Sequence, residues 1–467
     1  LVAVPEVRHG APVLEALAQR FGDLARLDSG VPEPERAHGW LRMGSGHGLG
    51  GGGRSAVLAP APDLGLVVLD EPHHYSYKED RSPRFDARRV ALERARLQEA
   101  ACVFVGSTPP VEIAHHLGDG RFGLVEPPSG RERDARPVVE TLEPSARWVL
   151  APALHQRIHS ALGHGQRVAL LTPARGYARA LWCATCRRSV RCPVCESGLF
   201  YDRAGANASG AGGGRSRVRC GHCGFVAPAP DACPSCGALD FRFVGAGSER
   251  LTEQLGKAFP RARIQRVDPG VEFLAPGAEP PDIYVTTWVG TKPSLRPPVS
   301  LVGVLDADSL LRRPDWRAAE HAYQALAAMA EWAGPAAAGG RLVVQTAEPG
   351  HYAVQAVVRG DFSFFLEREV TQRHELGYPP FSELIRATGF GPRRAGLIER
   401  VAGVARRVGA RVLGPIELRT PTGEAELEDA LEVLVKCDRA EPVCDELRGI
   451  LAAVPAGNRV RIDVDPR

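Results

Sequence analysis

The sequence has no uninterrupted apolar segment approaching the roughly 18 residues that a membrane-spanning helix needs. It also has no charged segment followed by an apolar one at its start, the pattern that directs secretion, so we expect a cytoplasmic protein without a membrane partner. The chain begins in the middle of an apolar strand pattern and without a methionine. We therefore expect the natural protein to extend upstream of Leu1.

Lysine is scarce, since only four of the 58 basic residues are Lys, and the net charge is only +3. A charge so close to zero does not by itself indicate a nucleic-acid partner. Arginine favours bidentate contacts with phosphate, but a GC-rich genome would produce the same bias. The 44% hydrophobic and 24% charged content is typical of a globular protein, and the length of 467 residues suggests about three domains.

A phosphate-binding loop of the form Gly-x-x-x-x-Gly-Lys-[Ser/Thr] is also missing from the sequence. The glycine-rich tracts at residues 44–53 and 205–214 contain no Lys, and we predict flexible, solvated loops there. An apolar strand does end in Asp70, Glu71 and His73, with which nucleic-acid motors hold Mg²⁺ and position water. The alternative is that these acids merely cap the next element.

Short apolar runs alternate with helical patterns through most of the chain, which indicates two α/β lobes built around parallel sheets. The last hundred residues change to the pattern of a small α+β domain. The predicted domains are a first lobe (1–147), a second lobe in two parts (148–182 and 244–370), a cysteine-rich insertion (183–243) and a C-terminal domain (371–467).

The insertion contains four Cys-x-x-Cys pairs, at Cys183 and Cys186, Cys192 and Cys195, Cys220 and Cys223, and Cys233 and Cys236. Two thiolates at this spacing can reach one tetrahedral ion, so four pairs predict two structural Cys₄ zinc sites. Disulfides would require a secreted protein, and the presence of four pairs argues against a redox role. Spacing alone permits more than one way of combining the pairs. We expect Cys102, Cys437 and Cys444 to be ordinary buried thiols.

In their order, these features resemble the primosomal protein N′ (PriA) family of superfamily 2 DNA helicases. The resemblance covers nearly the whole chain and rests on "LDEPHHYSYKEDRSPRF", "GSTPP", the cysteine insertion, "HELGYPPFS" and "RIDVDP". It implies two RecA-like lobes and a nested pairing of the cysteines. The first zinc would then be held by Cys183, Cys186, Cys233 and Cys236, and the second by Cys192, Cys195, Cys220 and Cys223.

The resemblance also implies that the second lobe should supply arginines for ATP hydrolysis. Trp332 and Pro335 stand where those two arginines would be, and neither can offer a cation to phosphate. We therefore expect the ATPase to be absent or very weak. Asp70, Glu71 and His73 would remain as a degenerate catalytic motif, with ATP and Mg²⁺ as doubtful cofactors.

The loop after the acidic motif mixes aromatic and basic side chains, which suits stacking on bases and contacts with phosphates of single-stranded DNA. The candidate DNA-binding residues are Tyr75, Tyr77, Lys78, Arg84 and Phe85. The alternative is that the aromatic rings pack on the sheet. Arg317 is expected to pair with Asp315 or Glu320 rather than with DNA. Residues 371–467 balance fifteen basic against fifteen acidic residues, which argues against DNA binding by that domain.

The resemblance implies a replication-restart protein that recognises stalled or branched forks and assembles the primosome. We expect it to act near the nucleoid as a zinc-bearing scaffold without helicase activity. Its partners would be fork DNA, single-stranded DNA, single-strand-binding protein and the replicative helicase or its loader. One alternative is an active ATP-dependent 3′–5′ helicase with a phosphate loop upstream of Leu1. Another alternative is that the chain is the product of a decaying gene and has no function. It is disfavoured because all eight cysteines of the predicted zinc sites remain.

Overall fold

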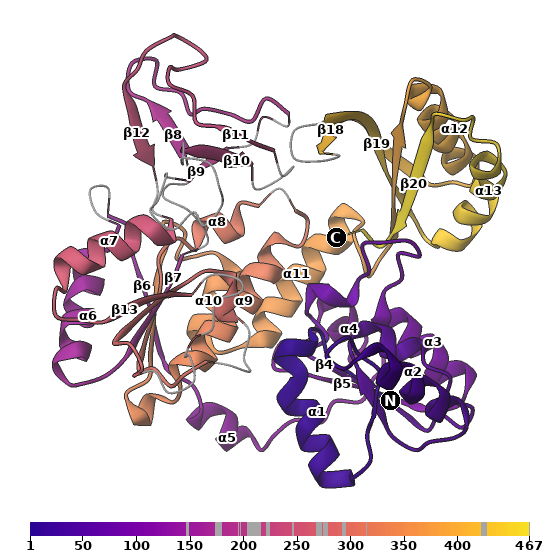
Figure 1. Cartoon of the computed structure of the whole chain (residues 1–467), viewed down its shortest axis with the longest axis horizontal. Coiled ribbons are helices and arrows are strands. Elements are labelled where there is room, and N and C mark those ends of the chain that lie inside the picture. The colour runs from indigo at the N-terminus through magenta and orange to yellow at the C-terminus, as the bar shows by residue number, and fades with distance from the viewer. Residues whose placement is uncertain are drawn as a thin grey trace.

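The computed structural model describes most of the chain. The described residues are 1–145, 149–172, 180–194, 196, 198–202, 216–220, 225–244, 247–267, 273, 279–291, 296–313, 315–421 and 427–466. Two lobes, an insertion and a C-terminal domain are distinct in Figure 1. Within the described residues, no helix is both long and apolar enough to cross a membrane.

The first lobe is built on a five-stranded parallel sheet in the order β2-β3-β1-β4-β5. Its strands are β1 (Val2–Ala3), β2 (Ala25–Arg26), β3 (Gly50–Gly52), β4 (Leu66–Asp70) and β5 (Ala101–Val105). The connecting helices include α1 (Val7–Phe21), α2 (Glu33–Gly44), α3 (Ala87–Leu97) and α4 (Val111–His115). Parallel strands joined by helices are the architecture that the apolar runs predicted.

The glycine tract at residues 44–53 is not a solvated loop, so that prediction is wrong. Its second half forms β3, which lies between β2 and β1 with Gly50, Gly51 and Gly52 buried. A Cβ atom on Gly51 would lie 2.8 Å from Cδ2 of Leu14, and one on Gly50 would lie 2.7 Å from Sδ of Met43. Glycine is needed here because the flanking helices approach the backbone closely. The second tract, 205–214, lies outside the described residues.

The second lobe has a six-stranded parallel sheet in the order β13-β14-β7-β15-β16-β6. The strands are β6 (Val138–Leu142), β7 (Val168–Leu171), β13 (Ile264–Val267), β14 (Ile283–Thr286), β15 (Leu301–Val304) and β16 (Arg341–Gln345). Strand β6 pairs with β16, so this lobe begins before the predicted boundary at residue 148. The sequence did not reveal this earlier boundary because the composition does not change between the edge strand β6 and the linker before it.

Helices cover both faces of the second sheet, and each face has its own hydrophobic core. One core contains side chains of α9 (Ala318–Ala333), α10 (Tyr352–Arg359) and α11 (Phe362–Leu376). The other contains side chains of α6 (Pro152–Gly163) and α7 (Ser248–Ala258). A parallel sheet buried on both faces explains why its strands read as continuous apolar runs.

The cysteine-rich insertion leaves and rejoins the second lobe through a two-stranded antiparallel ribbon of β8 (Ala180–Cys183) and β12 (Phe241–Val244). Beyond the ribbon lies a three-stranded sheet of β9 (Leu199–Asp202), β10 (Arg217–Cys220) and β11 (Val226–Pro228). Figure 1 shows the insertion standing out from the lobe that carries it. Its described hydrophobic core is small, and two of its six buried members are cysteines.

The C-terminal domain is a four-stranded antiparallel sheet in the order β18-β19-β17-β20. Its strands are β17 (Glu383–Phe390), β18 (Arg411–Pro421), β19 (Leu427–Cys437) and β20 (Arg459–Val464). Helices α12 (Arg394–Arg407) and α13 (Ala440–Ala452) pack on one face of the sheet. This is the α+β arrangement that the change of sequence pattern predicted.

Candidate metal centre and nucleic-acid interface

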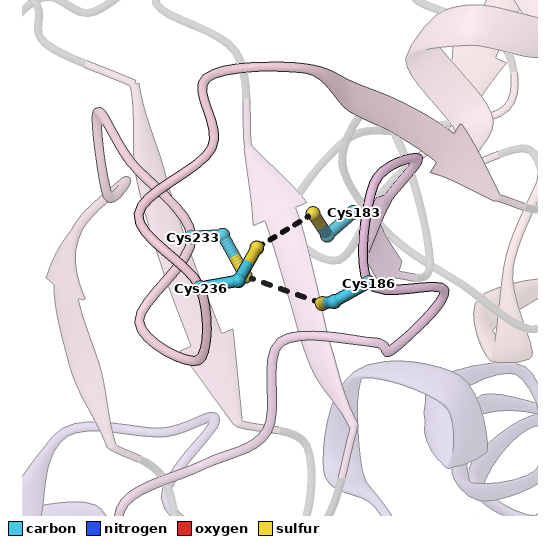
Figure 2. A group of neighbouring side chains, drawn as sticks. All are labelled: Cys183, Cys186, Cys233 and Cys236. Atoms are coloured by element: carbon cyan, nitrogen blue, oxygen red, sulfur yellow. Dashed lines mark hydrogen bonds between the residues drawn. The ribbon is translucent and has the colours of Figure 1, made fainter.

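Four cysteines from two separate turns converge at the base of the insertion. Cys183 is the last residue of β8 and Cys186 follows it, while Cys233 and Cys236 precede β12, so pairing of these two strands brings the two Cys-x-x-Cys segments together. The four sulfur atoms lie within 4.8 Å of one another. Figure 2 shows Cys183 Sγ facing Cys236 Sγ at 3.6 Å and Cys186 Sγ facing Cys233 Sγ at 3.7 Å. These are the members of the first predicted ligand set.

The geometry of this group fits a tetrahedral ion. Sulfur atoms about 2.3 Å from a central zinc would be about 3.8 Å apart, close to the two separations above. The backbone N–H of Cys186 lowers the pKa of the Cys183 thiol to about 6. The backbone N–H of Ser235 likewise lowers the pKa of Cys233. Amides that stabilise thiolates favour metal binding, so the group could hold a metal ion.

The second predicted set is only half described. Cys192 is 1% exposed and Cys220 is 2% exposed, and both lie in the small core of the insertion with Leu199 and Val218. Cys195 and Cys223 lie outside the described residues. The second site therefore stays a prediction. Of the remaining cysteines, Cys437 is buried, and the other two are half-buried.

The acidic motif lies at the carboxyl end of β4, at the edge of the sheet where parallel strands present functional groups. His73 Nδ1 lies 3.2 Å from Glu71 Oε2 and 3.3 Å from Thr108 Oγ1 of the "GSTPP" segment. Burial, helped by the charges of Asp70 and Glu331, raises the pKa of Glu71 to about 7. Burial lowers the pKa of His73 to about 4, so this ring is neutral at physiological pH.

The position expected to hold an arginine of the second lobe is filled by a buried tryptophan. Trp332 is 6% exposed, and its Nε1 donates to the carbonyl oxygen of Pro297 at 2.8 Å. Its ring lies against Phe273 and Tyr284 in the core that contains α9. Pro335, which stands at the second arginine position, lies after α9 at the start of a short 3₁₀ turn. Neither residue offers a cation to the acidic motif.

A different arginine of the second lobe acts on the acidic motif, and the sequence reasoning missed it. Arg296 Nη2 donates to the carbonyl oxygen of Thr291 at 3.2 Å, and Nη1 donates to that of Ala328. Burial lowers the pKa of Arg296 to about 10, against the opposing charges of Glu331 and Glu71. Arg296 follows a short Pro- and Lys-containing segment whose spacing matches no motif. Only the fold could have linked it to Glu71.

The aromatic-basic loop divides into a buried and an exposed part. The Tyr77 hydroxyl lies 2.8 Å from the carbonyl oxygen of Ala3 and 2.6 Å from that of Asp70, and the ring is fully buried. Lys78 is 3% exposed and its Nζ lies 3.0 Å from Asp463 Oδ1 of the C-terminal domain. These two predicted DNA contacts have no surface to offer a nucleic acid in this structure, because each instead fixes the loop to the fold.

The other three residues of the predicted DNA site have some exposure. Tyr75 is 57% exposed, its ring stacks on His74 at 4.5 Å, and its hydroxyl donates to Glu6 Oε1 at 3.2 Å. Arg84 and Phe85 are half-buried, and Phe85 packs partly on the core of the first lobe. The ring of Tyr75 is thus the most accessible stacking surface in the loop.

Five charged residues from three parts of the chain form what we call the interlobe ion network: Glu112, Arg317, Glu320, Glu369 and Arg373. Arg317 Nη2 donates to Glu112 Oε1 at 2.6 Å, so this arginine pairs across the lobes and not with Asp315 or Glu320 as expected. Arg373 Nη2 lies 2.7 Å from Glu320 Oε2, and its Nε lies 2.7 Å from Glu369 Oε1. The network joins α4 of the first lobe to α9 and α11.

A backbone contact reinforces this junction. The N–H of Val111, at the start of α4, donates to Glu320 Oε1 at 2.9 Å. Burial would raise the pKa of Glu320, but the charges of Arg373 and Arg317 outweigh it and hold this pKa at about 2. Glu320 is therefore ionised at neutral pH and fully paired. Separation of the lobes would remove the Val111 N–H from this carboxylate, while Arg373 of α11 would stay with it in the second lobe.

Comparison with known proteins decides the family. The family model described as "Primosomal protein N C-terminal domain" matches residues 374–467. The replication restart protein PriA of Treponema pallidum is 31% identical over 487 residues, covering 99% of this chain and 72% of the relative. The chain belongs to the PriA family.

Other PriA proteins match as broadly but are considerably longer. PriA of Bacillus subtilis is 30% identical over 405 residues, covering 83% of this chain and 49% of the relative. PriA of Synechocystis is 29% identical over 495 residues, covering 100% of this chain and 58% of the relative. The chain thus spans about half the length of these two PriA proteins.

The resemblance to PriA that the sequence motifs indicated is confirmed. Two parallel-sheet lobes with a small C-terminal α+β domain are also confirmed as the fold class. Among solved structures, the helicase MrfA bound to DNA and AMPPNP aligns at a TM-score of 0.41 with 9% identity, covering 78% of this chain and 44% of that one. That likeness is too weak to bear on the assignment.

Proposed function

We propose that the chain is part of a replication-restart protein that binds DNA at stalled or branched forks and supports primosome assembly without separating strands itself. The observation that carries this proposal is the buried Trp332 at the position of a catalytic arginine, with its Nε1 committed to Pro297. Loss of such an arginine costs about 10³–10⁵ in the rate of phosphoryl transfer. Membership of the PriA family supports the role in replication restart.

The interlobe ion network supports a scaffold over a motor. A motor of this class must open and close its two lobes in each cycle of ATP hydrolysis. Here Val111 and Glu112 of the first lobe bond to Glu320 and Arg317 of the second lobe in a buried setting. Opening would break the Arg317–Glu112 pair and remove the Val111 N–H from Glu320, whereas Arg373 of α11 would stay paired with Glu320 inside the second lobe. A rigid platform suits recruitment of other proteins.

We propose that the loop of the first lobe touches single-stranded DNA through its exposed part. Tyr75 offers an accessible ring for base stacking, and Arg84 and Phe85 lie on the same loop. Stacking of one base on an aromatic ring contributes about 1–3 kcal/mol. The recruited partners would be single-strand-binding protein and the replicative helicase or its loader, at the nucleoid.

We propose that the ion held by Cys183, Cys186, Cys233 and Cys236 is zinc, with a second zinc on Cys192, Cys195, Cys220 and Cys223. Four thiolate ligands leave no open coordination position, so both ions would be structural. The small core of the insertion supports this view, because so few apolar residues would not fold it alone. The zinc ions would stabilise a platform that projects from the second lobe.

One observation favours a second candidate, an active 3′–5′ helicase. The positive charge of Arg296, in the second lobe, opposes the rise in the pKa of Glu71 in the first lobe. With a phosphate loop upstream of Leu1, Arg296 would then neutralise the γ-phosphate. Its guanidinium, however, already donates to the carbonyl oxygens of Ala328 and Thr291. Those bonds position it as a structural group of the second lobe.

Fork binding and strand separation distinguish the two candidates. Full-length, zinc-loaded protein is mixed with a labelled fork, and binding and unwinding are measured with and without ATP. The scaffold predicts binding that ATP does not alter and no unwinding. ATP-dependent release of the labelled strand, abolished by Arg296→Gln, would establish the helicase instead. A protein that does not bind the fork at all would contradict both.

A further inference from the structure

The segment between α11 and β17 lies where the two lobes and the C-terminal domain meet. We call it the connector; it comprises residues 377–382 and belongs to the "HELGYPPFS" motif, to which the proposed function gives no role. The structure describes all six residues, and each is buried or half-buried. Segments that only link two domains run over the surface. Burial of the whole connector therefore indicates that it has a further role.

A column of stacked side chains joins the C-terminal domain to the second lobe through the connector. Lys436 Nζ of β19 lies 3.4 Å from the centre of the Tyr378 ring and donates to the carbonyl oxygen of Leu376 at 2.9 Å. The Tyr378 ring stacks on Trp316, with the ring centres 5.2 Å apart and the planes inclined by only 2°. Because Lys436 is buried, its contact with the ring stabilises more than the same contact would at an exposed site.

The other end of this column lies at the junction between the lobes. The guanidinium carbon of Arg317 lies 4.3 Å from the centre of the Trp316 ring, and that of Arg373 lies 4.7 Å from it. The same two arginines contact Glu112 of the first lobe, at 2.6 Å and 3.5 Å. A Trp316 ring that is held flat by Tyr378 therefore keeps both guanidinium planes oriented for Glu112.

The C-terminal domain is also fastened directly to the first lobe. Lys78 Nζ lies 3.0 Å from Asp463 Oδ1 of β20. Arg89 of α3 pairs with Glu383, at the start of β17, at 2.7 Å and also pairs with Asp465, directly after β20. Two elements of the first lobe thus bind two strands of the C-terminal domain.

The three contacts connect the domains in a closed triangle. The first lobe contacts the second, the second contacts the C-terminal domain through the column, and the C-terminal domain contacts the first lobe. If each domain moves as a unit, the lobes cannot separate while the C-terminal domain stays bound to both.

We propose that the C-terminal domain is a strap across the junction of the lobes, so that its release from either lobe loosens the contact between them. One end of the strap is the column of Lys436, Tyr378 and Trp316, and the other is formed by the pairs of Arg89 and Lys78. Coupling of this kind is reciprocal, so separation of the lobes would also free the C-terminal domain. The inference goes beyond the proposed function, because it holds whether or not the protein hydrolyses ATP.

The backbone N–H of Val111 reports on the junction. Val111 is the first residue of α4, where N–H groups have no partner within the helix, and it donates to Glu320 Oε1 of the second lobe at 2.9 Å. The exchange of this amide with deuterium therefore measures how often the contact opens. Hydrogen exchange resolved to Val111 is measured on the full-length, zinc-loaded protein and its variants.

Two variants each release one end of the strap, and each has a matched control. Lys436→Met removes the cation of the column, and its control Arg439→Met removes an exposed pair of the same domain. Arg89→Met removes both pairs of α3 with the C-terminal domain, and its control Arg96→Met removes an exposed pair on the same helix. Circular dichroism shows whether each variant is folded. Tyr378→Leu replaces Lys436→Met if that variant does not fold.

We expect exchange at Val111 to be about tenfold faster in Lys436→Met, because a cation–π contact away from water is lost. Arg89→Met loses two partly exposed pairs and should accelerate exchange by about threefold. Both controls should exchange as the wild type does. Lys436→Arg should restore slow exchange, because a guanidinium also stacks on an aromatic ring.

Wild-type exchange at Val111 in both strap variants would overturn the proposal. Acceleration in only one of them would also overturn it, because a strap must respond at both ends. Equal acceleration in the controls would show that any loss of charge has this effect, which again removes the strap. Fork binding and ATP turnover are measured separately, so failure of the strap leaves the proposed function standing, and failure of that function leaves the strap standing.

Discussion

Removal of Arg373 should destabilise the second lobe and its junction with the first lobe. Its guanidinium lies 2.7 Å from Glu320 Oε2, 2.7 Å from Glu369 Oε1 and 3.5 Å from Glu112 Oε1. The side chains of Glu320 and Glu369 are only 4% and 3% exposed, so Arg373→Met leaves two buried carboxylates without this cation. Breaking a buried pair costs about 3–5 kcal/mol. At about 2–4 °C per kcal/mol for a unit of 150–250 residues, the melting temperature should fall by about 6–20 °C.

The matched control is Arg368→Met on the same helix. Arg368 pairs with Glu367 at 3.8 Å, and the two side chains are 45% and 81% exposed, so its pair contributes at most about 1 kcal/mol. Thermal denaturation of the zinc-loaded protein is followed by circular dichroism. Glu320→Gln in the Arg373→Met background should recover part of the loss, because it removes the unpaired charge. Equal melting temperatures for Arg373→Met and Arg368→Met would show that the buried ion pairs of Arg373 do not stabilise the protein.

Three further predictions concern pH, zinc and packing. Because Arg373 holds the pKa of Glu320 at about 2, below its ordinary value of about 4.3, the stabilisation is complete above that ordinary value and disappears as the pH falls toward 2. The stability difference between wild type and Arg373→Met in urea should therefore be largest near neutral pH and shrink as the pH falls below 4; a difference that grows on acidification would contradict this. Cys183→Ser should lose one of the two proposed zinc ions and make the insertion sensitive to protease, because binding of a structural zinc contributes about 10–16 kcal/mol to folding. Unchanged zinc content would exclude Cys183 as a ligand. Gly51→Ala should lower the free energy of unfolding by about 1–3 kcal/mol, because the added Cβ would lie 2.8 Å from a leucine side chain of α1. The control is Gly65→Ala, whose added Cβ meets nothing within 4 Å. Equal melting temperatures for these two variants would contradict the close packing at Gly51.

Features with a strict local pattern could be predicted from the sequence. The Cys-x-x-Cys spacing allows Cys183 and Cys186 to face one point, and pairing of β8 with β12 brings Cys233 and Cys236, which precede β12, to the same point. The alternation of short apolar runs with helical patterns was sufficient to predict the parallel sheets. Strands of a parallel sheet are buried on both faces and are therefore apolar along their whole length.

Features that depend on packing between distant segments could not be predicted. Gly50–Gly52 has no apolar side chain, so only the close approach of neighbouring elements reveals a buried strand. Tyr77 and Lys78 look like DNA contacts in the sequence, but Tyr77 also bonds to Ala3, 74 residues away, and Lys78 bonds to Val464 in another domain. The pairing of Arg317 with Glu112 spans 205 residues, and no spacing rule reaches that far.

Measurement of ATP turnover tests most directly the proposal that this protein lacks the chemistry of a motor. Full-length, zinc-loaded protein is assayed with saturating forked DNA beside Asp70→Asn, which removes the carboxylate that would hold Mg²⁺. We expect equal, background rates for the two proteins, because the buried Trp332 stands where the proposal expects a catalytic arginine. Turnover that is stimulated by the fork and disappears in Asp70→Asn would contradict it.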